Sequence, residues 1–382
     1  MTAVTTAPRS IPRRPSAALP DEALLRMLRD MQLIREFENR TMQAYQQAKI
    51  GGFCHVYTGQ EALVVGTFAS VNHDDPIVTA YRDHGHALAR GMSPRACMAE
   101  MFGRATGCAK GKGGSMHMFD KPNHLYGGHG IVGAQTALGA GLAFAVKYEL
   151  EVLGRDLASG GNPKKRVALC YLGDGALNQG CLHEAMNLAG LWSLPVIFIV
   201  ENNLYSMGTS IHRGTTSADD LTKKAAAYEI DGFSFDGMDI LSLYDNFKPV
   251  ADACRDDQKP AFVDIRTYRY KGHSMSDPQK YRTREEVEEY ESKRDSIAML
   301  AAHLMRDRAC LSEDAWRAMQ DELAEIVRDA VKFADESPWP DPKAELYSDV
   351  MVSPHPRMSP SGEYVEGACN PILEGQPGGG ER

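Results

Sequence analysis

The sequence lacks a C-x-x-C pair, a long apolar run and any surplus of basic residues. Its eight cysteines are scattered over 382 residues, several of them in apolar stretches, as reduced and buried thiols would be. No apolar stretch approaches the roughly 20 residues that a membrane-spanning helix needs. The formal net charge of −9 leaves no basic face to attract a nucleic-acid backbone. We therefore expect a soluble intracellular protein that binds neither membranes nor nucleic acids.

The two ends of the chain are poor in residues that could form a core. Residues 1–20 contain arginines and prolines but no acidic residue, which fits either a transit peptide or a disordered tail. We favour the disordered tail because the prolines prevent the amphipathic helix that organellar import usually needs. Residues 353–382 are rich in proline and glycine and should not fold unaided. We expect a bacterial cytoplasmic protein, with the mitochondrial matrix or a plastid as the alternative.

The remaining residues, 21–352, are predicted to form one domain. With 43% hydrophobic residues the chain can bury a substantial core. Apolar residues recur at three- and four-residue spacing from Leu24 to Ile34, which predicts an amphipathic helix beginning near Asp21. The charged, helix-favouring stretch 285–333 predicts further helices toward the C-terminal end of the domain.

Two apolar runs in the middle of the chain predict buried β-strands. Residues 167–172 and 196–200 have the continuous apolar character of strands that are covered on both faces, and a helical pattern at 182–191 separates them. Such a strand, helix and strand form a unit with parallel strands. Residues 261–267 predict one more strand. The predicted fold class is therefore α/β, a parallel sheet with helices on both faces.

Polar motifs follow directly after the two central strands. Gly173-Asp174-Gly175 follows the first strand, and Asn203 follows the second. The carboxyl ends of neighbouring parallel strands meet at one edge of a sheet, where open α/β folds bind ligands. Mg²⁺ takes about six oxygens and shares them between one or two protein groups and the phosphates of a ligand. Asp174 and Asn203 can supply two of these oxygens, and the helix that follows could offer its N-terminal amides to an anion.

A Gly-Asp-Gly triplet alone is typical of an ordinary strand-to-helix turn, but its sequence context is more specific. The stretches 173–180, GDGALNQG, and 201–210, ENNLYSMGTS, together resemble the thiamine-diphosphate motif of the 2-oxoacid dehydrogenase alpha subunits. The resemblance implies that Asp174, Asn203 and the main-chain carbonyl of Tyr205 hold Mg²⁺, with Gly175 and Ala176 beside the diphosphate. The fold would then be a thiamine-diphosphate-binding fold.

The resemblance extends from about Leu24 to about Ala334. Three further segments that support it precede the metal motif in the sequence. The loop 52–62 matches the family loop whose histidine, here His55, lies in the active-site channel. The stretch 80–85 matches the segment that clamps the diphosphate through Tyr81 and Arg82, a suitable use of a planar, permanently charged guanidinium. The stretch 127–133 matches the one whose backbone, at Gly130 and Val132, holds the aminopyrimidine ring. Without this context, His55 could be an ordinary surface histidine, the Tyr81-Arg82 pair would carry no signal, and the stretch 127–133 could be a simple glycine-rich turn.

A fourth segment, 268–284, resembles the loop that carries regulatory phosphorylation in mitochondrial members of the family. It implies that His273 reaches the cofactor and acts in catalysis with His55, and that Ser274 stands at the main regulatory position. Lys280 replaces a second phosphorylatable serine of that pattern, so the resemblance supports catalytic use of the loop and leaves kinase control open. We expect the segment to order only when the cofactor binds, because its clustered Lys271, Arg282 and Arg284 repel one another.

Two glycine-rich patterns resemble nucleotide-binding loops without matching them. Gly139-Ala-Gly141 has Phe144 where a dinucleotide fingerprint has its third glycine, and we interpret it as helix packing. The stretch 110–115, KGKGGS, lacks the order of a phosphate-binding P-loop. By the resemblance, its Ser115 and the nearby His117 lie behind the cofactor channel.

The resemblance implies oxidative decarboxylation of a 2-oxoacid with thiamine diphosphate and Mg²⁺, followed by reductive acylation of a lipoyl group on an acyltransferase core. The chain has one cofactor-binding half, so a beta subunit in an α2β2 heterotetramer would complete the site. The stretch 273–278 is most similar to pyruvate-specific members, which makes pyruvate the expected substrate. Branched-chain 2-oxoacids and acetoin are the alternatives within the family. A cofactor-free structural or regulatory subunit is the alternative of another class.

Overall fold

The computed structural model describes residues 15–156, 160–346, 348 and 349. The chain divides into two compact units, Met1–Ser337 and Pro338–Arg382. The second unit contains the short helix α13 (Pro342–Glu345), which the side chain of Asp341 caps. Most of the predicted N-terminal tail and the whole predicted C-terminal tail lie outside the described residues. Their disorder, and the domain boundary at residue 352, therefore stay predictions.

The first unit is built on a six-stranded parallel sheet, with strands in the order β2-β1-β3-β4-β8-β7. The predicted unit of two strands and a helix is confirmed, because β3 and β4 are parallel neighbours along their whole length and α6 separates them in sequence. The strands are β1 (Ile77–Ala80), β2 (Leu125–His129), β3 (Ala168–Gly173), β4 (Val196–Asn202), β7 (Asp231–Asp236) and β8 (Ala261–Arg266), beside a small hairpin of β5 (Tyr205–Ser206) and β6 (Thr209–Ser210).

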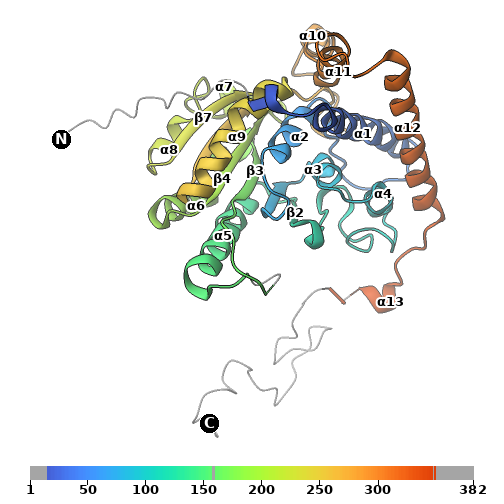
Figure 1. The fold of residues 1–382 in the computed structure, drawn as a ribbon. Coiled ribbons are helices and arrows are strands. Elements are labelled where there is room, and N and C mark those ends of the chain that lie inside the picture. The colour runs from blue at the N-terminus through green and yellow to red at the C-terminus, as the bar shows by residue number, and fades with distance from the viewer. Residues whose placement is uncertain (1–14, 157–159, 347, 350–382) are drawn as a thin grey trace, which may run out of the picture. The chain divides into compact units, whose positions relative to one another are not determined.

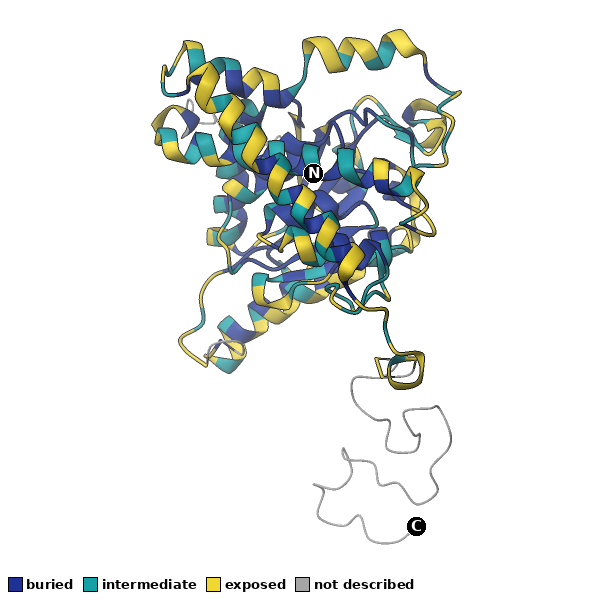
Figure 2. Ribbon diagram, turned by 90° about the vertical axis from the view of Figure 1, so that its right-hand side faces the viewer, coloured by how far each residue is buried: buried dark blue, intermediate teal, exposed yellow. Residues whose placement is uncertain are grey.

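Helices cover both faces of the sheet, as predicted (Figure 1). Successive residues of a strand point to opposite faces, and in β3 Leu169 and Tyr171 join one apolar cluster whereas Cys170 and Leu172 join another. The first cluster contains the buried faces of α1 (Asp21–Gln46), α2 (Glu61–Ala69) and α9 (Ile240–Asp257). The second contains those of α5 (Ala134–Tyr148) and α6 (Gly180–Trp192). Figure 2 shows the buried strands enclosed by helices whose outer faces are exposed.

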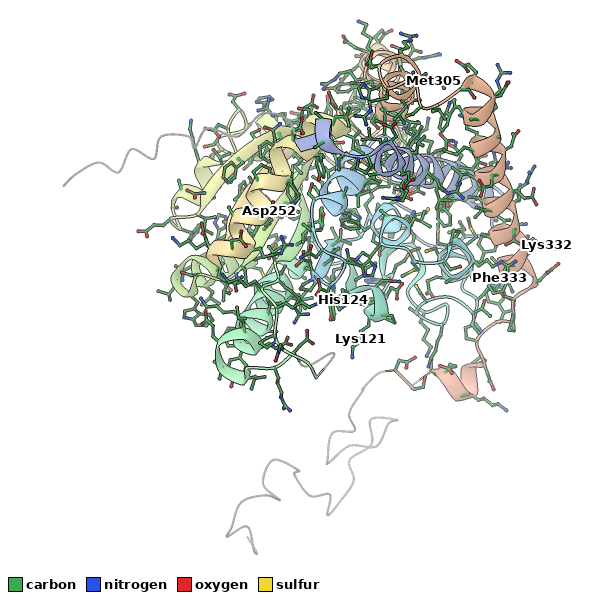
Figure 3. The ribbon with its side chains drawn as sticks, viewed as in Figure 1. Lys121, His124, Asp252, Met305, Lys332 and Phe333 are labelled. Atoms are coloured by element: carbon green, nitrogen blue, oxygen red, sulfur yellow. The ribbon has the colours of Figure 1, made fainter. Side chains whose placement is uncertain are left out.

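The predicted N-terminal helix is confirmed as α1, which begins at Asp21 and buries Leu24, Leu28, Met31 and Ile34. The stretch predicted to be helical near the C-terminus forms α10 (Arg284–Lys293), α11 (Ser296–Arg306) and α12 (Glu313–Glu336). Phe333 of α12 packs under the guanidinium of Arg95, which lies 5.4 Å from the ring centroid, whereas Lys332 points to solvent (Figure 3). None of the described helices is both long enough and apolar enough to cross a membrane.

Glycine at 139 permits close packing of α5 on the sheet, as the sequence predicted. A Cβ atom at this position would lie 2.5 Å from the Cβ of Cys170 in β3. The remaining helices and helical turns are η1 (Pro15–Ala18), α3 (His84–Ala89), α4 (Pro94–Met101), η2 (Gly114–Met116), η3 (Lys121–Asn123), η4 (Glu149–Leu153), η5 (Asp174–Asn178), α7 (Ile211–Gly214) and α8 (Lys223–Ala226).

Candidate active site

A cavity of about 780 Å³ lies at the carboxyl edge of the sheet. The chain enters it directly after β1, β2, β3, β4 and β8, which is where the ends of parallel strands converge. Its volume falls within the roughly 300–1,000 Å³ typical of pockets for small ligands. All the predicted site residues line it: His55, Tyr81, Arg82, Gly130, Val132, Asp174, Gly175, Ala176, Asn203, Tyr205 and His273.

Asp174, Asn203 and Tyr205 present oxygen atoms from two neighbouring strand ends. Asp174 is the first residue after β3, and burial raises the pKa of its carboxyl to about 6. Asn203 follows β4, and its side-chain N–H donates to Oε1 of Gln60 at 3.0 Å, while its Oδ1 accepts from the guanidinium of Arg269 at 3.1 Å. Leu204 adopts a left-handed backbone conformation with φ of 71°, which is uncommon for a leucine. This turn lies immediately before Tyr205, whose main-chain carbonyl is the third candidate ligand.

Two arginines face this cavity without a carboxylate partner. Arg82 and Arg269 are 5% and 1% exposed, and neither forms an ion pair with a described residue. Arg82 donates to the main-chain carbonyls of Val56 and His273 at 2.6 and 2.7 Å. Burial and the nearby Arg269 lower the pKa of Arg82 to about 10. Because a buried charge without a counter-ion is costly, this pair favours the binding of a multiply charged anion.

Three aromatic rings form a cluster in the wall of the cavity. The ring of His55 lies 4.6 Å from that of Tyr81 and 5.2 Å from that of His273, measured between centroids. Burial, together with the charge of Arg82, lowers the pKa of His55 to about 2 and that of His273 to about 3. Both imidazoles are therefore neutral near pH 7. Nδ1 of each lacks a hydrogen-bond partner in the described structure, so both rings can bond to a ligand.

A buried polar network lies behind His55. His84 pairs with both carboxylate oxygens of Glu38 through Nδ1, at 3.0 Å each, and its Nε2 lies 2.8 Å from Oγ of Ser115. The main-chain N–H of His55 donates to the same Oγ at 3.2 Å. Ser115 is 4% exposed and does not line the cavity. The network thus holds the backbone of His55, and it puts Ser115 behind the channel, where the resemblance had predicted it.

One detail of the sequence prediction was wrong. The basic side chains Lys271, Arg282 and Arg284 do not form an unpartnered cluster: Lys271 pairs with Glu291, Arg284 pairs with Glu288, and Arg282 donates to main-chain carbonyls. Mutual repulsion therefore cannot keep the segment open. The helix predicted at 182–191 is confirmed as α6, which begins at Gly180 after the 3-10 turn η5.

The sequence analysis missed four buried polar residues that line the cavity, namely Gln60, Gln135, Glu201 and Arg269. Glu201 accepts the hydroxyl of Tyr57 at 2.5 Å, and burial raises the pKa of its carboxyl to about 7. Arg269 could have been recognised. It stands just beyond a predicted strand, and β8 proves to be the next neighbour of β4 in the sheet.

The residues present fit Mg²⁺ and a diphosphate. The candidate ligands are a carboxylate, an amide oxygen and a main-chain carbonyl, the hard oxygens that Mg²⁺ prefers. Two of them, Asn203 Oδ1 and the carbonyl of Tyr205, already accept hydrogen bonds from a cationic guanidinium. The described residues contain no group of three or more His, Cys, Asp or Glu side chains that could hold a metal. A cation here would therefore need ligand phosphates to complete its coordination.

Fold and site together define an α/β protein with a cavity at the carboxyl edge of a parallel sheet, lined by buried arginines and by carboxylate, amide and carbonyl oxygens. Residues 29–343 match the family model described as the dehydrogenase E1 component. The chain belongs to this family.

Several curated relatives are similar to the chain over most of its length. It is 46% identical over 329 residues to the pyruvate dehydrogenase E1 component subunit alpha of Rickettsia conorii, covering 86% of this chain and 96% of the relative. Against the protein of the same name from Rhizobium meliloti the identity is 47%, covering 86% and 90%. A chloroplastic alpha-3 subunit from Oryza sativa is 39% identical, covering 91% and 80%. The similarity therefore includes bacterial and plant proteins of one name.

Proposed function

We propose that this chain is the alpha subunit of a pyruvate dehydrogenase. The enzyme decarboxylates pyruvate oxidatively with thiamine diphosphate and Mg²⁺ and transfers the two-carbon unit to a lipoyl group on an acyltransferase core, feeding acetyl-CoA formation. The observation that carries the proposal is the cavity in which hard oxygen ligands and two unpaired arginines meet at the ends of parallel strands. The names of the relatives support the choice of pyruvate.

The chain's own residues would divide the work by their chemistry. Asp174, Asn203 and the carbonyl of Tyr205 hold the cation, and Arg82, with Tyr81 beside it, binds the diphosphate. The backbone at Gly130 and Val132 and the turn at Gly175 and Ala176 approach the cofactor closely, which their small side chains or exposed main chain permit.

Thiamine diphosphate, when bound, supplies the nucleophilic carbon and the electron sink for decarboxylation. His55 and His273 are neutral at physiological pH because burial lowers their pKa. Each can therefore donate one hydrogen bond from its N–H to a carbonyl or carboxylate oxygen of the substrate without adding charge. Their rings pack edge to face, with centroids 5.2 Å apart.

A beta subunit completes the enzyme as an α2β2 heterotetramer. Supporting this, α5 and α6 carry large apolar side chains that remain exposed on the second face of the sheet; they are Leu138, Phe144, Tyr148, Leu188, Leu191 and Trp192. Monomeric proteins rarely expose large contiguous apolar patches, and such patches usually mark interaction surfaces. We place the assembly in the bacterial cytoplasm, consistent with the bacterial relatives and with seven free cysteines among the described residues.

The experiment is a calorimetric titration of thiamine diphosphate with Mg²⁺ into the complex of this chain with a beta subunit, followed by assays of pyruvate against branched-chain 2-oxoacids and acetoin. Asp174→Asn should weaken cofactor binding at least about 100-fold, since even indirect partners of a metal ligand are worth roughly 10–100-fold. Asp231→Asn, at an exposed strand start, is the control. Unchanged cofactor affinity in the Asp174 variant would refute the metal assignment, and no binding by the parent would favour a cofactor-free subunit.

A further inference from the structure

The glycine-rich loop between α4 and β2, residues 103–117, is folded around one buried carboxylate. Glu100 stands near the end of α4 and is fully buried. A Cβ atom at Gly107 would lie 2.3 Å from its Oε2, so the loop packs directly on the carboxylate. Each carboxylate oxygen accepts two main-chain N–H groups of the loop at 2.7 to 3.0 Å, and the four donors are Ala109, Gly111, Gly113 and Gly114.

The main-chain amides of the loop alternate in direction. The N–H groups of Lys110 and Lys112 donate to carbonyls three residues earlier in the loop, at 3.0 and 3.1 Å, whereas the amides on either side of them donate to Glu100. Lys110 and Gly111 have left-handed backbones, with φ of 58° and 75°. Concave sets of main-chain N–H groups of this kind bind phosphate and other anions. In this loop the protein's own carboxylate occupies the place of the anion, which explains a phosphate-loop composition without a phosphate site.

The C-terminal end of the loop supports two parts of the candidate active site. Oγ of Ser115 accepts the main-chain N–H of His55 at 3.2 Å. Nδ1 of His117 lies 3.1 Å from the carbonyl oxygen of Gly128. The ring of His117 also packs on Gly130, where a Cβ atom would lie 3.2 Å from two of its atoms. The loop therefore contacts the backbone at His55 and the backbone beside Gly130.

We propose that Glu100 is a positioning residue, an internal anion that organises the glycine-rich loop and through it holds His55 and the backbone at Gly130. The inference rests on the proposed function only in taking these two positions as cofactor contacts. Glu100 does not line the cavity, so it acts through the loop. Hydrogen bonds to a charged acceptor are stronger than those between neutral groups. Removing the carboxylate would leave four donors without their acceptor, which is costly where they are buried.

The test is chemical rescue of Glu100→Ala by sodium acetate, in the assembled complex with a beta subunit and at constant ionic strength. This substitution removes one CH₂ group and the carboxylate, so acetate matches the missing atoms. Amide hydrogen exchange over residues 107–116 should be at least about tenfold faster in the variant than in the parent, since one hydrogen bond to a charged group contributes at least that factor. Acetate should slow the exchange again, and sodium chloride should not.

Turnover provides the readout at the active site. Glu100→Ala should lower turnover about 10–100-fold, because a displacement of about 1 Å at the reacting groups can cost about 100-fold. Acetate should restore turnover over the same concentration range in which it slows the exchange. The affinity for thiamine diphosphate with Mg²⁺ should change less than turnover, because the candidate metal ligands do not lie on the loop.

Asp75 provides a matched control, a buried carboxylate at the opposite edge of the sheet. It precedes β1 and accepts the main-chain N–H groups of Asn72 and Val167 at 2.8 and 2.9 Å. Asp75→Ala should lower the unfolding temperature but leave exchange over residues 107–116 unchanged. Turnover of the folded complex should stay within about threefold of the parent.

The other outcomes are also decisive. Parental exchange in Glu100→Ala would mean that the carboxylate does not organise the loop, and faster exchange with parental turnover would overturn the positioning role. Failure of acetate to rescue, or equal rescue by neutral acetamide, would overturn the role of the charge.

Glu100→Gln is the second variant, for the case that Glu100→Ala fails to assemble. It keeps the volume but turns an amide NH₂ toward two of the N–H donors, so exchange should again be faster; parental exchange there contradicts the proposal. The exchange measurement needs no cofactor. Absence of cofactor binding by the parent complex would therefore contradict the proposed function and leave the result on the loop intact.

Discussion

At the scale of single residues, burial decides the charge state of the side chains in the cavity. The imidazoles of His55 and His273 stay neutral because burial and the neighbouring Arg82 lower their pKa. The arginines remain charged because even a pKa near 10, as for Arg82, lies far above neutrality. The cavity is thus positive where the diphosphate would bind and uncharged where the substrate would react.

Ser274 lies in the wall of the cavity, where an added negative charge would face the expected position of the diphosphate. It follows His273, lines the cavity, and its hydroxyl contacts only Ser276, at 3.1 Å, among the hydrogen bonds of the described structure. We predict that Ser274→Glu lowers the activity of the assembled enzyme at least about 30-fold, because opposed like charges cost several kcal/mol. Ser274→Ala, which adds no charge, should keep activity within about threefold of the parent. A steady-state assay of both variants decides, and parental activity in the glutamate variant would show that position 274 does not control the site.

The pair of His84 and Glu38 predicts a pH-dependent stability. Burial alone would lower the pKa of His84, but the carboxylate of Glu38 outweighs burial and raises it above the ordinary 6.5. The ion pair therefore stabilises the fold fully below that value and loses its contribution as the pH rises through the raised pKa.

We expect the difference in unfolding temperature between the parent and His84→Gln to be largest near about pH 6 and to shrink toward about pH 9. The control is His303→Gln, in an exposed pair with Asp307 on α11, which should change little across the range. Thermal unfolding followed by circular dichroism measures both. A difference for His84→Gln that does not vary with pH would mean that this histidine stabilises the fold only as a neutral group.

At the scale of elements, close packing of α5 on β3 sets the position of the second helical layer. A Cβ at position 139 would contact the Cβ of Cys170, which cannot move without the strand. We predict that Gly139→Ala destabilises the protein by about 1–3 kcal/mol, the usual cost of overpacking. Gly66→Ala is the matched control: its Cβ would meet Cδ2 of Leu243 at 3.1 Å and Cγ1 of Ile240 at 3.4 Å, both side-chain atoms, and no backbone or Cβ atom at the distance found for Gly139. Alanine has a higher helix propensity than glycine, and this gain should offset any strain at position 66.

Unfolding temperatures of the two variants test this prediction. Equal stability of Gly139→Ala and Gly66→Ala would mean that α5 can shift away from the sheet without loss.

Element positions could be predicted only where the sequence signal was strong. The continuous apolar runs of β3 and β4 predicted two neighbouring parallel strands, and the structure confirms them. The sequence analysis did not recognise β1, β2 and β7. Strand β1 has only four residues, β2 contains two glycines, and β7 is largely exposed. Short or polar strands are stabilised by their neighbours in the sheet, so their own residues carry little signal.

At the scale of the whole molecule, the exposed apolar residues of α5 and α6 predict that the chain works only in an assembly. We expect the purified chain to lack decarboxylase activity and to gain it with a beta subunit. Trp192→Glu, at a side chain 48% exposed on α6, should reduce assembly because a charge would be buried in an apolar interface. Met299→Glu, at a side chain 39% exposed on α11, should not.

Sedimentation velocity of the mixed subunits, with activity measured in parallel, checks the prediction. Turnover by a monodisperse preparation of this chain alone would contradict it. Normal assembly of the Trp192 variant would exclude the α5–α6 face as the subunit interface.

The sequence by itself determined the fold class, the family and the candidate ligands, because these depend on local patterns. Apolar runs specify buried strands, and a polar residue just after such a strand must lie at the edge where ligands bind. Asp174 and Asn203 could be located in this way, and the family motif then indicated Tyr205, Arg82 and His273.

Only the tertiary structure decided which partners these residues have. Arg269 reaches Asn203 because β8 pairs with β4, and Glu38 reaches His84 because α1 packs beside α3. Lys271 and Arg284 turn out to be paired with glutamates of α10, so the repulsion expected from the sequence does not arise. Charge, burial and hydrogen bonding depend on contacts between distant parts of the chain, and these form only when the elements pack together.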